Sequence, residues 1–383
     1  MYKEFIDLVR DLFKTNETIP LHEPVFQGKE LDYVTEALDS TLISSNVGEY
    51  VEEFEKKVCD FTDSKFAIST VNGTSALHLS LLLNNVEPED EVITQSLTFI
   101  ATCNAIRYLG AEPIFIDVDR NSLGLSPEAL ENFIEDNCFL NSEGILINKI
   151  TNKKIKACLP MHTFGFPSHL AELQALCSKY NISLVEDAAE SLGSFYRNRH
   201  TGTFGNCSAL SFNGNKIITT GGGGMVLTDN EKIAEKARHL STQAKTVKKW
   251  KFDHDQIGFN YRMPNLNAAI GVAQMKQLPK FLSAKRKLSK KYFDWGQKNN
   301  YKFVQESKDC KANYWLNVLL TRNLTERNQF LEATNKKKIM TRPAWSPMHT
   351  LKMYEKNPKG DLKNTNWLYE RLVTVPSGVT VFE

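Results

Sequence analysis

The sequence has no apolar run of about 18 residues, the length that a membrane-spanning helix needs. Its opening stretch, MYKEFIDLVRDLF, mixes charged and apolar residues at helical spacing and lacks the uninterrupted apolar segment of a secretory signal. The chain also lacks an excess of charge of either sign, because its 47 basic and 45 acidic residues nearly balance and give a formal net charge of +2. We therefore expect a cytoplasmic protein with no electrostatic footprint for nucleic acid or for an anionic membrane.

The cysteines do not indicate a disulfide framework or a metal site either. The seven cysteines are odd in number, scattered along the chain and contain no CxxC pair. They are Cys59, Cys103, Cys138, Cys158, Cys177, Cys207 and Cys310. Neither a disulfide scaffold nor a zinc site is implied, and we expect no bound metal.

Short apolar runs alternate with amphipathic stretches over residues 65–240. The runs that we expect to form strands are 65–71, 92–95, 113–118, 157–161, 183–185, 208–212 and 224–228, and the expected helices are 75–83, 99–109, 126–137 and 168–180. Strands interleaved with helices predict an α/β fold, with a mainly parallel sheet covered on both faces.

The pattern changes after about residue 265, where helices are expected over 279–299, 325–339 and 364–373 and a strand over 313–320. A chain of 383 residues exceeds what one ordinary core organises. The sequence thus predicts a large α/β domain over residues 1–265, with an N-terminal helical arm, and a smaller α+β domain over 266–383.

Polar residues follow three of the expected strands. Asn72-Gly73-Thr74-Ser75 leads directly into a helix, where free backbone N–H groups and hydroxyls could seat a phosphate, although a simple helix cap explains the same residues. The strand 183–185 ends in Glu186-Asp187-Ala188-Ala189-Glu190, whose carboxylates could bind a metal, orient a histidine, hold a protonated ring nitrogen or cap the structure.

Lys216 follows the strand 208–212 in a stretch, residues 202–226, that is otherwise uncharged. A lone lysine is usually a solvated surface charge, but a lysine in a pocket behind a buried strand can form a Schiff base. A phosphate seat, an acidic strand end and this lysine together suit pyridoxal phosphate, which needs backbone donors, an anion at its ring nitrogen and an amine for its aldehyde. Phe99 could lie flat against the ring, or could simply pack in the core.

Five segments resemble the DegT/StrS family of nucleotide-sugar aminotransferases, a branch of the fold-type-I pyridoxal-phosphate enzymes. They are NGTSALHLSLLL, SLTFIATCNAIRYLGAEPIFIDVD, VEDAAESLGSFY, SFNGNKIITTGGGGMVLTD and GFNYRMPNLNAAIGVAQM. The flanks IPLHEPVFQGKELDYVTEALDS and TRPAWSPMHTL resemble the LegC-like branch, which aminates the 4-keto group of a UDP-linked N-acetylated deoxysugar.

The resemblance implies a role for individual residues. Lys216 would form the Schiff base and move the proton, Asp187 would pair with the ring nitrogen, and Phe99 would stack on the ring. The phosphate would be held by Gly73, Thr74 and Ser211. Glu190 matches a position near the ring hydroxyl that is commonly Gln, and His162 matches a polar position facing the site, where a buried structural histidine is the alternative. Asn260 matches an asparagine that reaches the phosphate of the neighbouring subunit, which would make the enzyme a homodimer with shared active sites.

Two further positions distinguish this chain from relatives. Many relatives have Gly-Glu-Gly-Gly where this chain has four glycines, Gly221 to Gly224. A dehydratase branch of the family replaces the lysine by histidine, so Lys216 favours transamination.

The resemblance therefore implies transfer of an amino group from L-glutamate to a UDP-linked 4-keto-6-deoxy-N-acetylhexosamine for surface glycans, with a dehydratase or a catalytically idle relative as alternatives. Substrate contacts could come from Arg342, Trp345 and His349, since an aromatic ring can stack on a base and a cation attracts diphosphate. The basic segment 245–251 is another candidate, although a solvated loop explains it as well.

Overall fold

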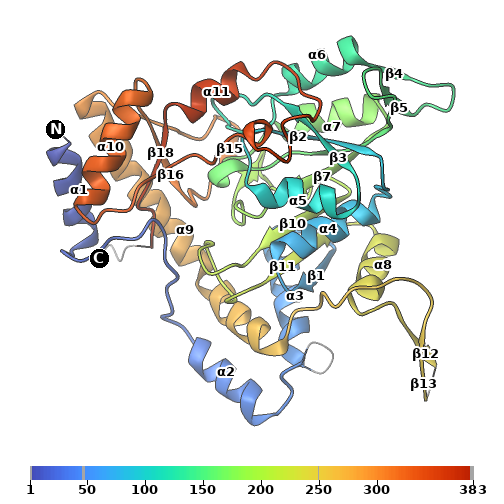
Figure 1. Ribbon diagram of the computed structural model, residues 1–383. Helices are drawn as coiled ribbons and strands as arrows, with labels where there is room; N and C mark the ends of the chain where they lie inside the picture. The colour runs from blue at the N-terminus through green and yellow to red at the C-terminus, as the bar shows by residue number, and fades with distance from the viewer. Residues whose placement is uncertain (1, 45–47, 249, 380–383) are drawn as a thin grey trace.

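Figure 1 shows a computed structural model of the chain, in which residues 2–44, 48–248 and 250–379 are described. A seven-stranded sheet has the spatial order β1-β11-β10-β7-β6-β2-β3. Its strands are β1 (Phe66–Thr70), β2 (Glu91–Gln95), β3 (Glu112–Ile116), β6 (Ile155–Leu159), β7 (Ser183–Asp187), β10 (Cys207–Ser211) and β11 (Gly224–Thr228). All neighbours are parallel except β11, which is antiparallel to both β1 and β10. The predicted mainly parallel α/β sheet is confirmed.

Helices cover both faces of this sheet (Figure 1). They are α3 (Glu49–Thr62), α4 (Gly73–Leu83), α5 (Ile100–Tyr108), α6 (Pro127–Asn137), α7 (Leu170–Lys179) and α8 (Glu231–Ser241), whereas α2 (Glu30–Asp39) packs on the later helix α9 (Asn265–Asn299). Because successive strand residues point to opposite faces, Ala157 packs in one core cluster with α4, α5 and α8, and Cys158 packs in another with α6 and α7. The sheet is therefore buried on both sides, as its near-continuous apolar strands require.

The long helix α9 (Asn265–Asn299) joins the large sheet to the C-terminal unit (Figure 1). The sequence predicted a helix only from Pro279, which lies inside α9. Proline usually ends a helix, but here the turns before it are held by tertiary packing. At Gly271 an added Cβ would lie 2.8 Å from the ring of Phe54, so a glycine lets α9 approach α3 closely.

The C-terminal unit contains a four-stranded antiparallel sheet of order β14-β16-β18-β17. Its elements are β14 (Lys302–Phe303), β16 (Asn317–Leu320), α10 (Leu324–Lys336), β17 (Arg342–Pro343), α11 (Lys363–Tyr369) and β18 (Leu372–Val375). The helix predicted over 364–373 is wrong at its end, because Leu372 and Val373 pair with β16. All four residues of β18 are buried, and periodicity alone does not distinguish such a short apolar run from a buried helix.

The N-terminal helix α1 (Lys3–Phe13) lies with the C-terminal unit, not with the large sheet. Phe5 and Val9 pack in one core cluster with Tyr292 of α9, Phe330 of α10 and Val373 of β18. The boundary predicted at residue 265 stays a prediction, but the N-terminal arm belongs physically to the smaller unit.

Short elements complete the described chain. They are β4 (Cys138–Leu140), β5 (Leu146–Asn148), β8 (Phe195–Tyr196), β9 (Arg199–His200), β12 (Lys245–Lys248), β13 (Lys251–His254), β15 (Cys310–Lys311) and the 3₁₀ turns η1 (Thr163–Gly165) and η2 (Met348–Thr350). No helix in the described ranges is both long enough and apolar enough to cross a membrane. Nor do the described residues include three or more His, Cys, Asp or Glu grouped to hold a metal ion.

Candidate active site

A cavity of about 320 Å³ lies at the carboxyl ends of β1, β7 and β10. Such strand ends are the usual ligand position in parallel α/β sheets. Eight residues singled out from the sequence line this cavity: Gly73, Thr74, Phe99, Asp187, Glu190, Ser211, Lys216 and Trp345. The structure thus brings together residues from five segments that are far apart in the sequence.

The start of α4 forms one wall. Its cap is Asn72, whose Oδ1 accepts the N–H of Ser75 at 2.8 Å, so the hydroxyl of Thr74 is not used as the cap. The first N–H groups of a helix have no partner within the helix and attract anions. At Gly73 an added Cβ would lie 2.8 Å from Cβ of Ser211, so glycine allows α4 to begin directly against the end of β10. Backbone donors and the Ser211 hydroxyl therefore meet at one point of the cavity.

Asp187 ends β7 at the back of the cavity and is almost fully buried. The hydroxyl of Thr102 donates to Asp187 Oδ2 at 2.7 Å, and the N–H of Ala189 donates to Oδ1 at 3.2 Å. Burial raises the pKa of this carboxyl, while the two hydrogen bonds and nearby Lys216 act in the opposite direction. Asp187 is thus held rigidly where a cationic partner would be favourable.

Lys216 lies in the loop between the antiparallel strands β10 and β11. Its Nζ is 3.2 Å from Glu190 Oε1 and 4.2 Å from the ring centroid of Trp315. The indole N–H of Trp315 donates to the backbone oxygen of Asn215 at 2.7 Å. A carboxylate and an aromatic face therefore orient the lysine amine from two sides.

Phe99 and Trp345 form an aromatic side of the cavity. Their ring centroids are 5.8 Å apart, and Trp345 also packs on Phe164 with centroids 4.8 Å apart. Phe99 precedes α5 and remains 46% exposed, which leaves its ring free to contact a ligand. Trp345 comes from the C-terminal unit, so both units contribute to the cavity.

Three other predicted site residues lie outside the cavity lining. His162 is buried and uses both ring nitrogens, since the N–H of Ser168 donates to Nδ1 at 3.1 Å and Nε2 lies 3.1 Å from Glu186 Oε2. This geometry favours its structural alternative. Arg342 is exposed and donates to Asn335 and to its neighbour's backbone, and His349 contacts Ser96 Oγ through Nδ1 at 2.7 Å.

Asn260 is also absent from the lining. It is exposed and pairs through a backbone bridge with Thr242. The basic segment 245–251 belongs to the β12–β13 hairpin, and its residue 249 lies outside the described residues. A contact of Asn260 with a neighbouring subunit stays a prediction.

Several lining residues were not singled out from the sequence, above all Asn213, Asn215 and Trp315, and Asn72 was recognised only as part of the candidate phosphate seat. Asn213 and Asn215 stand just before Lys216 on either side of Gly214, and an amide next to a glycine is a signal that could have found them. Trp315 belongs to the C-terminal unit and lies 99 residues after Lys216 in the sequence. No local sequence pattern indicates that it lines the cavity.

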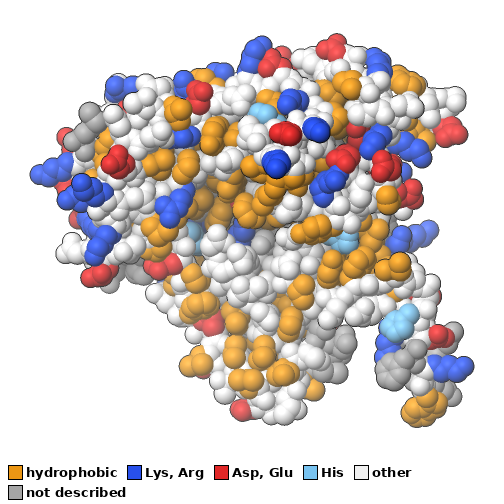
Figure 2. All heavy atoms as spheres, viewed as in Figure 1, with side chains coloured by type: hydrophobic (Ala, Val, Ile, Leu, Met, Phe, Trp, Pro, Cys, Tyr) orange, Lys and Arg blue, Asp and Glu red, His pale blue; other side chains and the backbone are white. Residues whose placement is uncertain are grey.

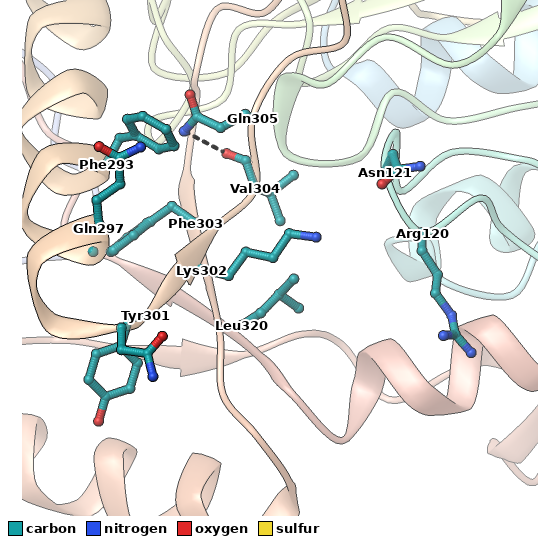
Figure 3. Close-up of a pocket in the computed structure, with 12 residues that line it drawn as sticks. Arg120, Asn121, Phe293, Gln297, Tyr301, Lys302, Phe303, Val304, Gln305 and Leu320 are labelled. Carbon is teal, nitrogen blue, oxygen red and sulfur yellow. Dashed lines mark hydrogen bonds between the residues drawn. The ribbon is translucent and has the colours of Figure 1, made fainter.

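A larger cavity of about 400 Å³ lies elsewhere, between the end of α9, β14 and the Arg120–Asn121 turn (Figure 3). Figure 3 shows Lys302 and Arg120 on different sides of this cavity. Lys302 belongs to the edge strand β14, and Arg120 lies in the connection between β3 and α6. None of its described lining residues is a carboxylate, and none belongs to a strand of the seven-stranded sheet. The smaller cavity is therefore the better candidate for chemistry.

The donor set of the smaller cavity fits pyridoxal phosphate. The start of α4 with Ser211 suits a phosphate, buried Asp187 suits a protonated ring nitrogen, and the Lys216 amine suits an aldehyde. A mainly parallel sheet that carries these three groups at its strand ends defines a pyridoxal-phosphate enzyme of fold type I.

Comparison with known proteins identifies the family. The chain belongs to the DegT/DnrJ/EryC1/StrS aminotransferase family, whose model matches residues 24–382. It is 40% identical to the GDP-perosamine synthase of Escherichia coli O157:H7 over 364 residues, which is 94% of each protein. It is 35% identical to the GDP-perosamine synthase of Caulobacter vibrioides over 90% of this chain and 89% of that protein.

Solved structures agree with this assignment. Helicobacter pylori PseC, an aminotransferase involved in the biosynthesis of pseudoaminic acid, superposes with a TM-score of 0.84 at 25% identity over 94% of both chains. An aminotransferase from Psychrobacter cryohalolentis superposes with a TM-score of 0.83 at 26% identity, over 96% of this chain and 95% of that one. The predicted family, fold type, enzyme class and cofactor are confirmed, whereas the LegC-like branch stays a prediction.

Proposed function

We propose that this enzyme transfers an amino group from L-glutamate to the ketone of a nucleotide-linked sugar. The observation that carries the proposal is the meeting of Lys216, Asp187 and the α4 start in one cavity, within a family of aminotransferases. Pyridoxal phosphate supplies an electron sink for the carbon that exchanges its amine.

In this proposal the residues of the chain have separate tasks. The start of α4 and Ser211 bind the phosphate, Asp187 keeps the ring nitrogen protonated, and Phe99 covers one face of the ring. Lys216 binds the cofactor aldehyde and afterwards moves a proton at the substrate carbon. Its contacts with Glu190 and Trp315 support this task, because they restrict the amine to one small region.

The best candidate acceptor is a UDP-linked 4-keto-6-deoxy-N-acetylhexosamine. The sequence flanks that resemble the LegC-like branch support it, and Trp345 offers an aromatic face beside the cavity. Both relatives described above are named GDP-perosamine synthase, so a GDP-linked keto sugar is the competing acceptor. Arg342 and His349 remain candidate substrate contacts only if the C-terminal unit moves toward the cavity.

We also propose a homodimer with shared active sites. Large apolar side chains are exposed along α2 and its flanks, at Phe26, Leu31, Leu38, Leu42 and Ile43. Figure 2 shows hydrophobic side chains gathered over the region where Figure 1 places α2. Exposed apolar patches of this kind support association with a partner, and exposed Asn260 would then be free to reach the partner's phosphate.

The first test is the visible absorption spectrum of the purified protein with pyridoxal phosphate, before and after addition of L-glutamate. We expect a Schiff-base band that L-glutamate converts into the band of the aminated cofactor, and no Schiff-base band in Lys216→Ala. UDP-linked and GDP-linked 4-keto sugars, each added to the aminated enzyme, should then differ in how fast they restore the original band. A band that L-glutamate leaves unchanged would contradict the proposed donor, and loss of water from the sugar without amination would favour the dehydratase.

A further inference from the structure

Glu190 forms a buried ion pair with Lys216. Oε1 of Glu190 is 3.2 Å from Lys216 Nζ, and the exposed fractions of the two side chains are 2% and 12%. The other carboxyl oxygen, Oε2, accepts the backbone N–H of Phe164 at 2.9 Å. The carboxyl group is therefore fixed in place, with one oxygen directed at the amine.

The charges around Glu190 come from few groups. Lys216, on the loop after β10, is its only salt-bridge partner among the described residues. Asp187, at the start of Glu190's own loop, is a like charge that acts against ionisation of Glu190. The 162–166 segment offers the Phe164 N–H, and the 313–315 segment offers the Trp315 ring to Lys216 and the Asn313 amide to the backbone oxygen of Glu190.

These surroundings make the charge of Glu190 depend on the charge of Lys216. Burial raises the pKa of Glu190 to about 7, and the Lys216 ammonium opposes that rise. If the ammonium lost its charge, the opposing effect would vanish, and the carboxyl would hold a proton at still higher pH.

We infer that Glu190 takes up the proton that Lys216 gives up when its amine condenses with the aldehyde of the cofactor. In this step a C=N bond forms and the aldehyde C=O bond breaks. Two hydrogens of the ammonium leave with the carbonyl oxygen as water, and the third is transferred as a proton to the carboxylate. No oxidation occurs, and the pair passes from one positive and one negative charge to two neutral groups.

The consequence is a site whose net charge does not change when Lys216 is bonded or released. The proton stays on Glu190, within hydrogen-bond reach of the lysine. A neutral substrate amine that displaces the lysine therefore releases Lys216 as a free amine, which can accept the proton from the substrate carbon. This inference rests on the proposed function, since it requires Lys216 to be the residue that bonds the cofactor. It assigns Glu190 a proton-transfer role in addition to the predicted contact with the ring hydroxyl.

The test counts protons exchanged on cofactor binding. Pyridoxal phosphate is titrated calorimetrically into cofactor-free protein near pH 8, in buffers of different ionisation enthalpy, so that the heat reports the protons released. Wild type is compared with Glu190→Gln, which keeps the size and the oxygen acceptor for Phe164 but does not titrate. Glu172→Gln serves as the matched control, because that carboxylate binds Tyr196 and Arg197 and does not line the cavity.

We expect Glu190→Gln to release more protons than wild type, by close to one per Schiff base formed, and Glu172→Gln to match wild type. By linkage, cofactor affinity in Glu190→Gln should then rise with pH more steeply than in wild type, by about tenfold per pH unit. Equal proton counts in wild type and Glu190→Gln would overturn the inference while leaving the Schiff base intact. Absence of the Schiff-base band in wild type would instead overturn the proposed function.

A second measurement keeps the inference testable if Glu190→Gln does not fold. The infrared difference spectrum of wild type, with and without cofactor, should show a new band of a protonated carboxyl group. A difference spectrum that lacks this band, in protein whose visible spectrum shows the Schiff base, would overturn the inference.

Discussion

Individual glycines after Lys216 differ in the space around them. An added Cβ at Gly224 would lie 2.3 Å from the backbone oxygen of Asn72 and 2.7 Å from the nitrogen of Gly73. At Gly222 the nearest atom, the backbone oxygen of Val71, is 3.7 Å away. The glycine run therefore contains one position, Gly224, where an added Cβ would collide with backbone atoms and another, Gly222, that has room for a side chain.

This contrast gives a prediction for two single substitutions. Gly224→Ala should destabilise the protein by about 1–3 kcal/mol and weaken cofactor binding, because the backbone at the start of α4 must move. Gly222→Ala should change stability by less than about 0.5 kcal/mol, as surface substitutions usually do. Urea unfolding and cofactor titration of both variants check this, and equal losses at the two positions would contradict it.

The residues that the sequence could identify are those whose chemistry stands out locally. Lys216 is the one charge in a long uncharged segment, and Asp187 ends a buried strand; both line the cavity. His162 could be assigned either way from the sequence, and only its bonds to Ser168 and Glu186 favour the structural alternative. Trp315 was missed because its position beside Lys216 depends on how the two units pack, and no sequence pattern specifies that.

Helix α9 carries a buried charge where it connects the two units. The side chain of Lys285 is fully buried, and its Nζ donates to the backbone oxygens of Trp315 at 3.1 Å and Ser377 at 2.5 Å. Through Trp315, whose ring faces Lys216, this lysine holds the C-terminal unit against the active-site loop. Burial lowers the pKa of Lys285 to about 7.

The lowered pKa makes stability depend on pH in a defined direction. Between about pH 7 and the usual lysine range near 10.4, the unfolded chain binds a proton at this position that the folded chain lacks, so stability should rise with pH. The rise attributable to Lys285 is at most about 1.4 kcal/mol per pH unit. Lys285→Met should lose this rise, and Lys287→Met, on the exposed face of the same helix, should keep it. Urea unfolding from pH 7 to 9 checks this, and parallel curves for wild type and Lys285→Met would count against it.

At the level of elements, strands and helices of the large sheet were predictable because their apolar runs are separated by clear polar turns. The antiparallel direction of β11 was not, since a run of apolar residues does not show which way a buried strand points. That direction matters for the site, because it places Lys216 in the loop between two adjacent antiparallel strands. The packing partners of the N-terminal helix could not be predicted for a similar reason: its amphipathic pattern shows that it packs, but not that it packs on α9, α10 and β18.

At the scale of the whole molecule, the cavity lies between the carboxyl ends of strands of the large sheet and two tryptophans of the C-terminal unit. Gly73, Asp187 and Lys216 come from the large sheet, whereas Trp315 and Trp345 come from beyond α9. Motion of one unit against the other would change the aromatic surroundings of Lys216 without altering the groups proposed to bind the cofactor. The arrangement suits an aminotransferase that must accept an amino donor and a sugar nucleotide in turn.

Sharing of active sites between subunits can be tested by mixing two inactive variants, Lys216→Ala and Asn260→Ala, under conditions that let subunits exchange. If each site uses Lys216 of one subunit and Asn260 of its partner, a mixed dimer has one site with both defects and one intact site. Random exchange makes about half of the dimers mixed, so about a quarter of wild-type activity should return. Mixing Lys216→Ala with Asp187→Asn is the matched control, because both residues belong to the same subunit's cavity and every site then keeps one defect. Recovery in the first mixture but not in the second would place Asn260 across the interface, whereas no recovery in either would mean that each chain builds its active site alone.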